Sequence, residues 1–179
     1  ALSPDTLLRL GDTALPYAEK ILVREPPASF SDTALRDSLT RLYAMGFRHF
    51  LALSLGGIRL GREAGFILHG ASPLNLTNSL ALEELEKLGL LDCTLSVELS
   101  AGRIAHLGGA LPRGIEAYGR LPLMVLRNCP VRAFAGCGRC KAGAGAIQDR
   151  QKRRFPVSCA GGTARSEERR VGKECRSRW

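Results

Sequence analysis

Short apolar runs alternate with amphipathic segments up to about residue 120 of this 179-residue chain. Leucines recur at helical spacing in residues 33–45 and 79–88, and a glycine follows each segment, so both are predicted helices. The compact runs 47–53, 66–69 and 93–97 are predicted strands. Alternation with short connections is typical of βα units on a parallel sheet. The sequence therefore predicts an α/β fold.

A parallel sheet of this kind can be doubly wound or can belong to a (β/α) barrel. Dinucleotide-binding doubly wound sheets carry a G-x-G-x-x-G loop after a strand, whereas Gly56 and Gly57 are predicted to form only a turn. We therefore expect residues 1–126 to form a partial (β/α) TIM-like barrel. A closed barrel needs on the order of 250 residues, so its first strands are expected to be missing. The chain alone is then expected to be inactive. It is also expected to self-associate, because an incomplete barrel would expose the apolar faces of its helices, which carry Leu35, Leu39, Leu82 and Leu85.

Polar side chains follow the predicted strands, where barrel enzymes place their chemistry. Glu98 and His69 are the candidate catalytic residues. Glu98 can instead cap a helix that starts near Ser100, and His69 can be a partly buried histidine without a chemical role. The candidate substrate-binding residues are equally compatible with turns, caps or packing. They are Asn75, Asn78, Tyr118 and Arg120.

Four cysteines with the spacing C-x7-C-x2-C-x18-C are the strongest chemical signal in the chain. They are Cys129, Cys137, Cys140 and Cys159. Thiolates repel one another unless a cation neutralises them, so a local cluster indicates bridging or a metal. The amino-terminal residues lack the pattern of a secretory signal, and no apolar run reaches membrane-spanning length. We therefore expect a cytoplasmic protein without a membrane partner, in which metal ligation is favoured over disulfides.

Charge is concentrated around these cysteines. Residues 1–126 carry a net charge of −1, whereas residues 127–154 carry +7. The basic side chains can balance an anionic iron–sulfur cluster, contact the phosphates of a nucleic acid, or belong to a solvated loop. We expect residues 127–164 to form an irregular, basic, cysteine-rich segment.

Residues 165–179 resemble the translation of a common DNA sequencing adapter along their whole length. The alternative is a genuine basic tail. We expect an artefactual tail that contributes nothing to the fold, which removes Cys175 and Trp179 from the functional argument. The predicted organisation is therefore a partial barrel over 1–126, the cysteine segment over 127–164 and the tail over 165–179.

Several segments are similar, in order, to stretches of the collagenase-like peptidase family, the U-thirty-two peptidases. They are residues 74–79, 94–100, 118–124, 128–131, 137–140, 149–150 and 155–159. The resemblance covers the chain from about Leu15 to Cys159 and implies the later strands of a barrel followed by a cysteine-bearing segment, as in bacterial members. Several members hold a four-iron four-sulfur cluster on four cysteines, so the resemblance implies such a cluster on the four cysteines of this chain, with zinc as the alternative. The separation of Cys137 from Cys140 by only two residues departs from the spacing of the best-known hydroxylation members.

The resemblance implies that the parent protein is an enzyme, and three functions remain open. The first is a peptidase acting on a protein or peptide. The second is an iron–sulfur-dependent, oxygen-independent hydroxylation factor acting on transfer RNA or ribosomal RNA. The third is a scaffold without catalysis that a metal, iron–sulfur or zinc, staples together. No G-x-S-x-G or H-E-x-x-H motif occurs, so the sequence alone does not indicate a protease mechanism.

Overall fold

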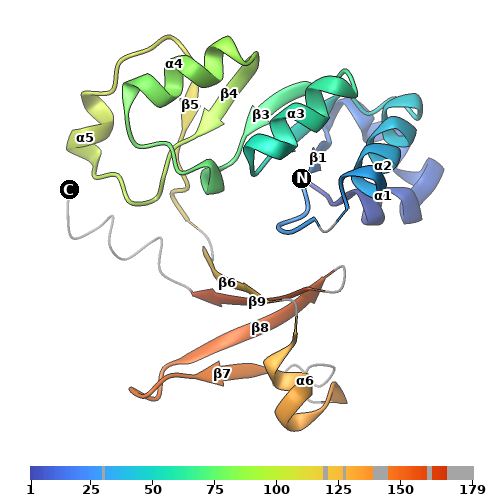
Figure 1. Cartoon of the computed structure of the whole chain (residues 1–179), viewed down its shortest axis with the longest axis vertical. Coiled ribbons are helices and arrows are strands. Elements are labelled where there is room, and N and C mark those ends of the chain that lie inside the picture. Colours follow the sequence, from blue (N-terminus) through green and yellow to red (C-terminus); the bar gives the residue numbers. More distant parts are fainter. Residues whose placement is uncertain (30, 119–120, 127, 139–144, 161–162, 169–179) are drawn as a thin grey trace. The chain divides into compact units, whose positions relative to one another are not determined.

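The computed structural model describes residues 1–29, 31–118, 121–126, 128–138, 145–160 and 163–168. The chain divides into two units, Ala1–Glu116 and Ala117–Trp179. We call them the first unit and the second unit. Each has its own sheet, which Figure 1 shows in different colours along the chain.

The first unit is built on a five-stranded sheet in which all neighbouring strands are parallel. The strands lie in the order in which they occur in the sequence, so each strand is the neighbour of the one before it. This sheet confirms the predicted α/β class. The strands are β1 (Leu22–Arg24), β2 (His49–Ala52), β3 (Ile67–Gly70), β4 (Leu90–Thr94) and β5 (Arg113–Gly114).

Helices precede or connect these strands, and four of the described helices begin with a side-chain cap. Ser3, Ser31, Ser54 and Asn78 each accept a hydrogen bond from a backbone N–H of the first turn that follows. Among the described residues, no helix is both long enough and apolar enough to cross a membrane. The helices are α1 (Pro4–Leu10), the 3-10 segment η1 (Gly11–Lys20), α2 (Asp32–Ala44), α3 (Leu55–Glu63), the 3-10 turn η2 (Ser72–Leu74), α4 (Ser79–Lys87) and α5 (Ala101–Ala105).

Two local predictions are wrong. Gly56 and Gly57 lie inside the first turn of α3 rather than in a free turn, because Ser54 caps the helix before them. The fourth strand runs over Leu90–Thr94 rather than over 93–97, because the chain reverses at Gly89, which has a φ of 86° and ends α4 at once. Both errors concern where an element begins, which short-range patterns define poorly.

The helices cover one face of the sheet. Phe50 and Leu68 are buried on that face, and a Cβ added to Gly61 of α3 would lie only 2.6 Å from the Phe50 ring and 2.8 Å from Leu68. The opposite face, which carries His49, is only half-buried. The expectation that the leucine faces of the helices would be exposed is wrong, since these helices bury them against their own sheet. The leucines concerned are Leu35, Leu39, Leu82 and Leu85.

The second unit is a four-stranded sheet in the order β6-β9-β8-β7, with antiparallel neighbours. Regular strands and one helix thus occupy the region predicted to be an irregular segment. The first of these strands belongs to this unit because it pairs with β9, so the division falls at Glu116 rather than at residue 126. The elements are β6 (Leu121–Leu126), α6 (Pro130–Ala135), β7 (Ala146–Gln148), β8 (Arg154–Ala160) and β9 (Thr163–Glu168).

Strand β9 overlaps the predicted tail at residues 165–168. Its backbone pairs with both β6 and β8, for example Val125 with Arg165 and Ser158 with Arg165. Residues 169–179 lie outside the described residues. Residues 165–168 therefore belong both to the predicted tail and to β9. A truncation experiment can test whether these residues contribute to the second unit.

Candidate functional site

Two histidines and an aspartate form a chain of hydrogen bonds on the half-buried face of the parallel sheet. His49 Nδ1 lies 2.9 Å from His69 Nε2, and His69 Nδ1 lies 2.9 Å from both carboxylate oxygens of Asp92. The side chain of His69 is only 12% exposed, whereas that of Asp92 is 43% exposed. A carboxylate that holds an imidazole ring in one orientation is the usual support for a general base. We call these three residues the histidine relay.

The sheet itself brings the relay together. His49, His69 and Asp92 come from the neighbouring parallel strands β2, β3 and β4. The pairing of β3 with β4 shifts between Leu68 and His69, so that His69 lies opposite Asp92, and Leu91 is the extra residue. Bulges of this kind re-aim side chains and are over-represented beside active sites. Without the shift, His69 would lie opposite an apolar leucine.

The strand register also defines the surroundings of the relay. Leu22 and Ile67 are the register partners of His49 on either side, so the ring lies between two apolar positions. Leu51 is the partner of His69, and Arg24 is the next position outward in that row. The relay is thus a polar group on a face that is otherwise mostly apolar, with one cation in the same row.

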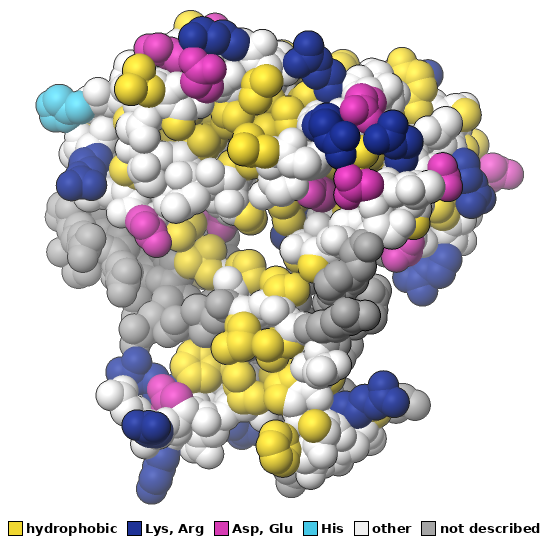
Figure 2. Space-filling view, viewed as in Figure 1, with side chains coloured by type: hydrophobic (Ala, Val, Ile, Leu, Met, Phe, Trp, Pro, Cys, Tyr) yellow, Lys and Arg dark blue, Asp and Glu magenta, His cyan; other side chains and the backbone are white. Residues whose placement is uncertain are grey.

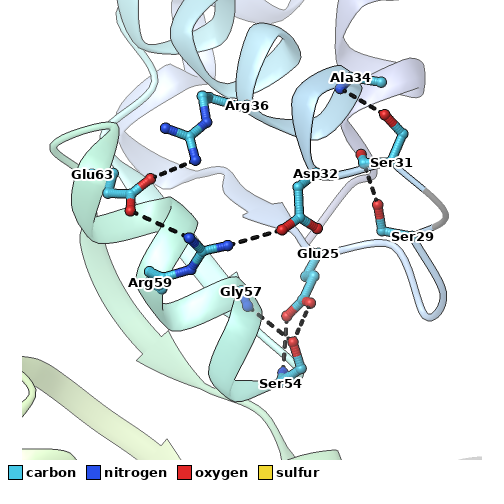
Figure 3. A network of polar contacts seen from close by, with 10 residues as sticks. All are labelled: Glu25, Ser29, Ser31, Asp32, Ala34, Arg36, Ser54, Gly57, Arg59 and Glu63. Atoms are coloured by element: carbon cyan, nitrogen blue, oxygen red, sulfur yellow. Dashed lines mark hydrogen bonds and ion pairs between the residues drawn. The ribbon is translucent and has the colours of Figure 1, made fainter.

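A second polar group lies at the carboxyl end of β1. The buried carboxylate of Glu25 accepts hydrogen bonds from the backbone N–H groups of Leu53 and Ser54, at 2.5 and 2.9 Å, and from Ser54 Oγ at 2.6 Å. Figure 3 shows it at the start of α3, close to Gly57, where an added Cβ would lie 2.0 Å from Glu25 Oε2. A glycine is required here because the carboxylate fills the space of a side chain. Glu25 therefore uses its hydrogen-bonding capacity to join β1 to α3.

Figure 3 also shows an ion-pair network on α2 and α3. Arg59 bridges Asp32 at 2.8 Å and Glu63 at 3.7 Å, and Arg36 contacts Glu63 at 2.9 Å. The side chains are 40–64% exposed, and exposed ion pairs contribute roughly 0–1 kcal/mol each. This network supports the helix pair and offers no reactive group.

The two predicted substrate-binding asparagines have local structural partners. Asn75 adopts the left-handed conformation with a φ of 53°, and its Oδ1 accepts a hydrogen bond from Ser96 Oγ at 2.6 Å. Asn78 caps α4 through Ala81 N–H at 2.9 Å, as the capping alternative predicted. Asn78 also lines an open cleft of about 580 Å³ with Arg103 and His106 of the α5 region.

The predicted catalytic residues do not share one position in the fold. His69 lies within β3 as part of the relay, whereas Glu98 lies in the exposed turn between β4 and α5. The backbone N–H of Glu98 donates a hydrogen bond to Ser96 Oγ at 3.2 Å. Tyr118 is 83% exposed at the start of the second unit, and Arg120 lies outside the described residues.

The predicted metal ligands are only partly described. Cys129 directly precedes α6, Cys137 is exposed just after it, and Cys159 belongs to β8. Cys140 lies outside the described residues. Within the part of the chain that the structure describes, no three or more His, Cys, Asp or Glu side chains form a group able to hold a metal.

Cys93 behaves as a small buried apolar residue, as its strand position predicted. It is buried in β4 with 2% exposure, and burial raises the pKa of its thiol, with the neighbouring Asp92 adding to the effect. A raised pKa keeps the thiol protonated and unreactive. Cys93 is therefore part of the core rather than of the relay.

The fold and the site define a class: an α/β domain whose parallel sheet is covered by helices on one face and carries an imidazole–carboxylate relay on the other. No family model, curated protein or solved structure matches the chain.

Sequence reasoning found His69 but missed His49 and Asp92. It considered polar residues after the strands, whereas the relay lies within them. A usable signal was present. In β2 and β3 buried and less buried residues alternate, and His49 and His69 each follow or precede a buried apolar residue, in Phe47-Arg48-His49-Phe50 and Ile67-Leu68-His69. Asp92 had no such signal, because the register shift that places it opposite His69 depends on strand pairing.

Proposed function

We propose that the chain belongs to the collagenase-like peptidase family and forms part of a (β/α) barrel enzyme that hydrolyses peptide bonds. The observation that carries the proposal is the histidine relay on the half-buried face of a sequentially ordered parallel sheet. Hydrolysis needs a base that takes a proton from water, and a carboxylate-supported imidazole provides one. The substrate class is a protein or peptide.

The strand order supports a barrel rather than a doubly wound sheet. In a doubly wound sheet the order reverses at a switch point and helices cover both faces. In a barrel each strand lies beside its predecessor and the helices form an outer ring. Strands β1 to β5 follow the second pattern, and the buried residues of the helices pack on one face. The relay would then lie on the inner face of the barrel.

The proposal includes a thiolate-bound metal in the second unit, which the spacing of the cysteines supports. Cys129 packs with the buried Val131 and Val157, and Cys159 follows Val157 by two residues in the same strand, β8. Together with Cys137 and Cys140, these cysteines would provide the four sulfur donors of a four-iron four-sulfur cluster, or of zinc as the alternative. A bound cluster would supply electron transfer, whereas zinc would only hold the segment together. This chemistry suits the reducing cytoplasm, which we propose as the location.

A second candidate function, hydroxylation of RNA, is favoured by the charge of the second unit. Lys152 and Arg153, which precede β8, and Arg154, its first residue, are exposed in succession, and Arg132 of α6 is exposed as well. Figure 2 shows Lys and Arg side chains at the margins of this unit, with an acidic side chain among them, and both signs of charge over the first unit. Phosphate contacts need such a basic surface. A cluster beside bound RNA is the arrangement that this function would require.

Metal content and cleavage together test the proposal. The chain is purified without oxygen, its absorption spectrum and bound metal are measured, and gelatin cleavage is assayed after adding the amino-terminal barrel segment of a collagenase-like relative. Gelatin cleavage is expected for the peptidase. A brown protein with thiolate-to-iron absorption but no cleavage supports the hydroxylase instead, and a colourless zinc protein supports the scaffold.

Single substitutions locate the metal. Cys137→Ser or Cys140→Ser should lower the bound metal severalfold, because each removes one of four donors. Cys93→Ala is the matched control, since that thiol is buried in the first unit. Unchanged metal content in every cysteine variant would reject the ligand set.

A further inference from the structure

We infer that Nε2 of His49 is the atom of this site that takes a proton from the reacting group, and that His69 and Asp92 are positioning residues that act through His49. The inference deepens the proposed function and rests on it only for the source of the proton. It assigns to His49 a role that the sequence attributed to His69. The argument starts from the direction of each hydrogen bond in the relay.

The direction of the hydrogen bonds follows from the Asp92 carboxylate, which can act only as an acceptor. An ionised carboxylate only accepts hydrogen bonds, so Asp92 requires His69 Nδ1 to carry a hydrogen. In a neutral imidazole the other nitrogen then has a free lone pair, so His69 Nε2 is an acceptor. His69 Nε2 lies 2.9 Å from His49 Nδ1, and that nitrogen must therefore be the donor. The remaining nitrogen, His49 Nε2, is left without a hydrogen.

The resulting step moves protons and breaks no other bond. His49 Nε2 takes a proton from the attacking group, and the hydrogen on its Nδ1 passes to His69 Nε2. His49 is then neutral again with the hydrogen on the opposite nitrogen, and His69 is an imidazolium in contact with the Asp92 carboxylate. The positive charge comes to rest beside the carboxylate, where it is stabilised most strongly.

The burial of the three side chains agrees with this direction. His69, the middle member, is 12% exposed, which suits a ring whose two nitrogens are both used within the relay. His49 is half-buried between Leu22 and Ile67, which keeps its ring in place while leaving it reachable. A shared metal ion is the competing arrangement for two close imidazole nitrogens. Zinc takes four donors, but Asp92 already binds the other nitrogen of His69, and the described residues form no group of three or more His, Cys, Asp or Glu able to hold a metal.

The test is to read the tautomers directly by 15N NMR of the full chain labelled at histidine. The chain contains three histidines, so each ring can be assigned by a His→Gln variant. Protonated and unprotonated imidazole nitrogens differ widely in 15N shift, and the measurement works on a solution or on sedimented protein. Wild type should show His49 and His69 as Nδ1–H tautomers.

Asp92→Asn tests the direction of the relay. An amide can donate to His69 Nδ1, and an asparagine in place of a carboxylate is known to leave a supported imidazole in the wrong tautomer. Both His69 and His49 should therefore change to the Nε2–H form. His106 is an internal control, because its Nδ1 contacts the carbonyl of Gly102 at 2.6 Å and not the relay. His49→Ala should leave the His69 tautomer unchanged, since Asp92 sets it.

Three results would overturn the inference. They are an Nε2–H tautomer of His49 in wild type, a response to Asp92→Asn in His69 without one in His49, and zinc added at micromolar concentration that shifts both rings together. Preserved circular dichroism of Asp92→Asn shows that the variant is folded. Tautomers as expected with no gelatin cleavage would reject the proposed function and leave the relay standing, so the two failures are distinguishable.

Discussion

The two units of the chain differ in the apolar core that their described residues form. In the first unit, one continuous core of buried residues joins the parallel sheet to the helices, with Phe47, Phe50 and Leu39 fully buried. In the second unit, the described core consists of Val131 and Val157 with a few partly buried neighbours. Folding free energy from apolar burial scales with the area removed from water. The first unit is therefore held by its own core.

The contrast is consistent with the proposed metal site in the second unit. Small units with little apolar core usually need a metal, a disulfide or a partner to stay folded. The second unit contains the proposed thiolate ligands, whereas the thiol of the first unit, Cys93, is simply packed in the core. Each of the following experiments tests this difference, in order of decreasing expected effect.

Truncation of a buried aromatic ring should give the largest effect. Phe50→Ala should destabilise the first unit by about 3–5 kcal/mol, because the ring is fully buried between β2 and α3. Val157→Ala in the second unit removes less buried surface and should cost about 1–2 kcal/mol. Urea unfolding followed by fluorescence and circular dichroism measures both. Ile67→Ala, on the half-exposed face with 43% exposure, is the control and should cost less than Phe50→Ala.

Removal of the charge that joins β1 to α3 should have an intermediate effect. Glu25→Gln should destabilise the first unit by roughly 1.5–3 kcal/mol, because one oxygen that accepts from backbone or serine donors becomes an NH2 group. Glu19→Gln, at an exposed position, is the matched control. Equal midpoints for the two variants in urea would show that the Glu25 contacts add no stability.

Deletion of the predicted tail should have the smallest effect. A chain ending at residue 164 should keep the unfolding midpoint of the first unit, because the core of that unit lies within Ala1–Glu116. A second chain ending at Glu168 retains β9 and separates the strand from the residues after it. Scanning calorimetry of both chains is the measurement. A lower unfolding midpoint or less bound metal in the shorter chain alone would show that residues 165–168 stabilise the second unit.

Part of the candidate site was predictable because it depends on residue chemistry alone. His69 stands at the end of a compact apolar run, which indicates a polar group on a strand, and Asn78 precedes a leucine-periodic helix as an N-cap. Glu98 was chosen by its place after a strand, and the structure puts it in an exposed turn. Proximity in sequence to a strand end does not decide whether a side chain faces a site.

The sequence by itself determined the α/β class, the main helices and the burial of Cys93, because these follow from local hydrophobic periodicity and capping. Tertiary structure alone decided the sequential strand order, the burial of Glu25 and the meeting of His49, His69 and Asp92. The physical reason is that strand pairing joins residues far apart in the chain. A register shift of one residue at β4 determines whether His69 lies opposite a carboxylate or a leucine.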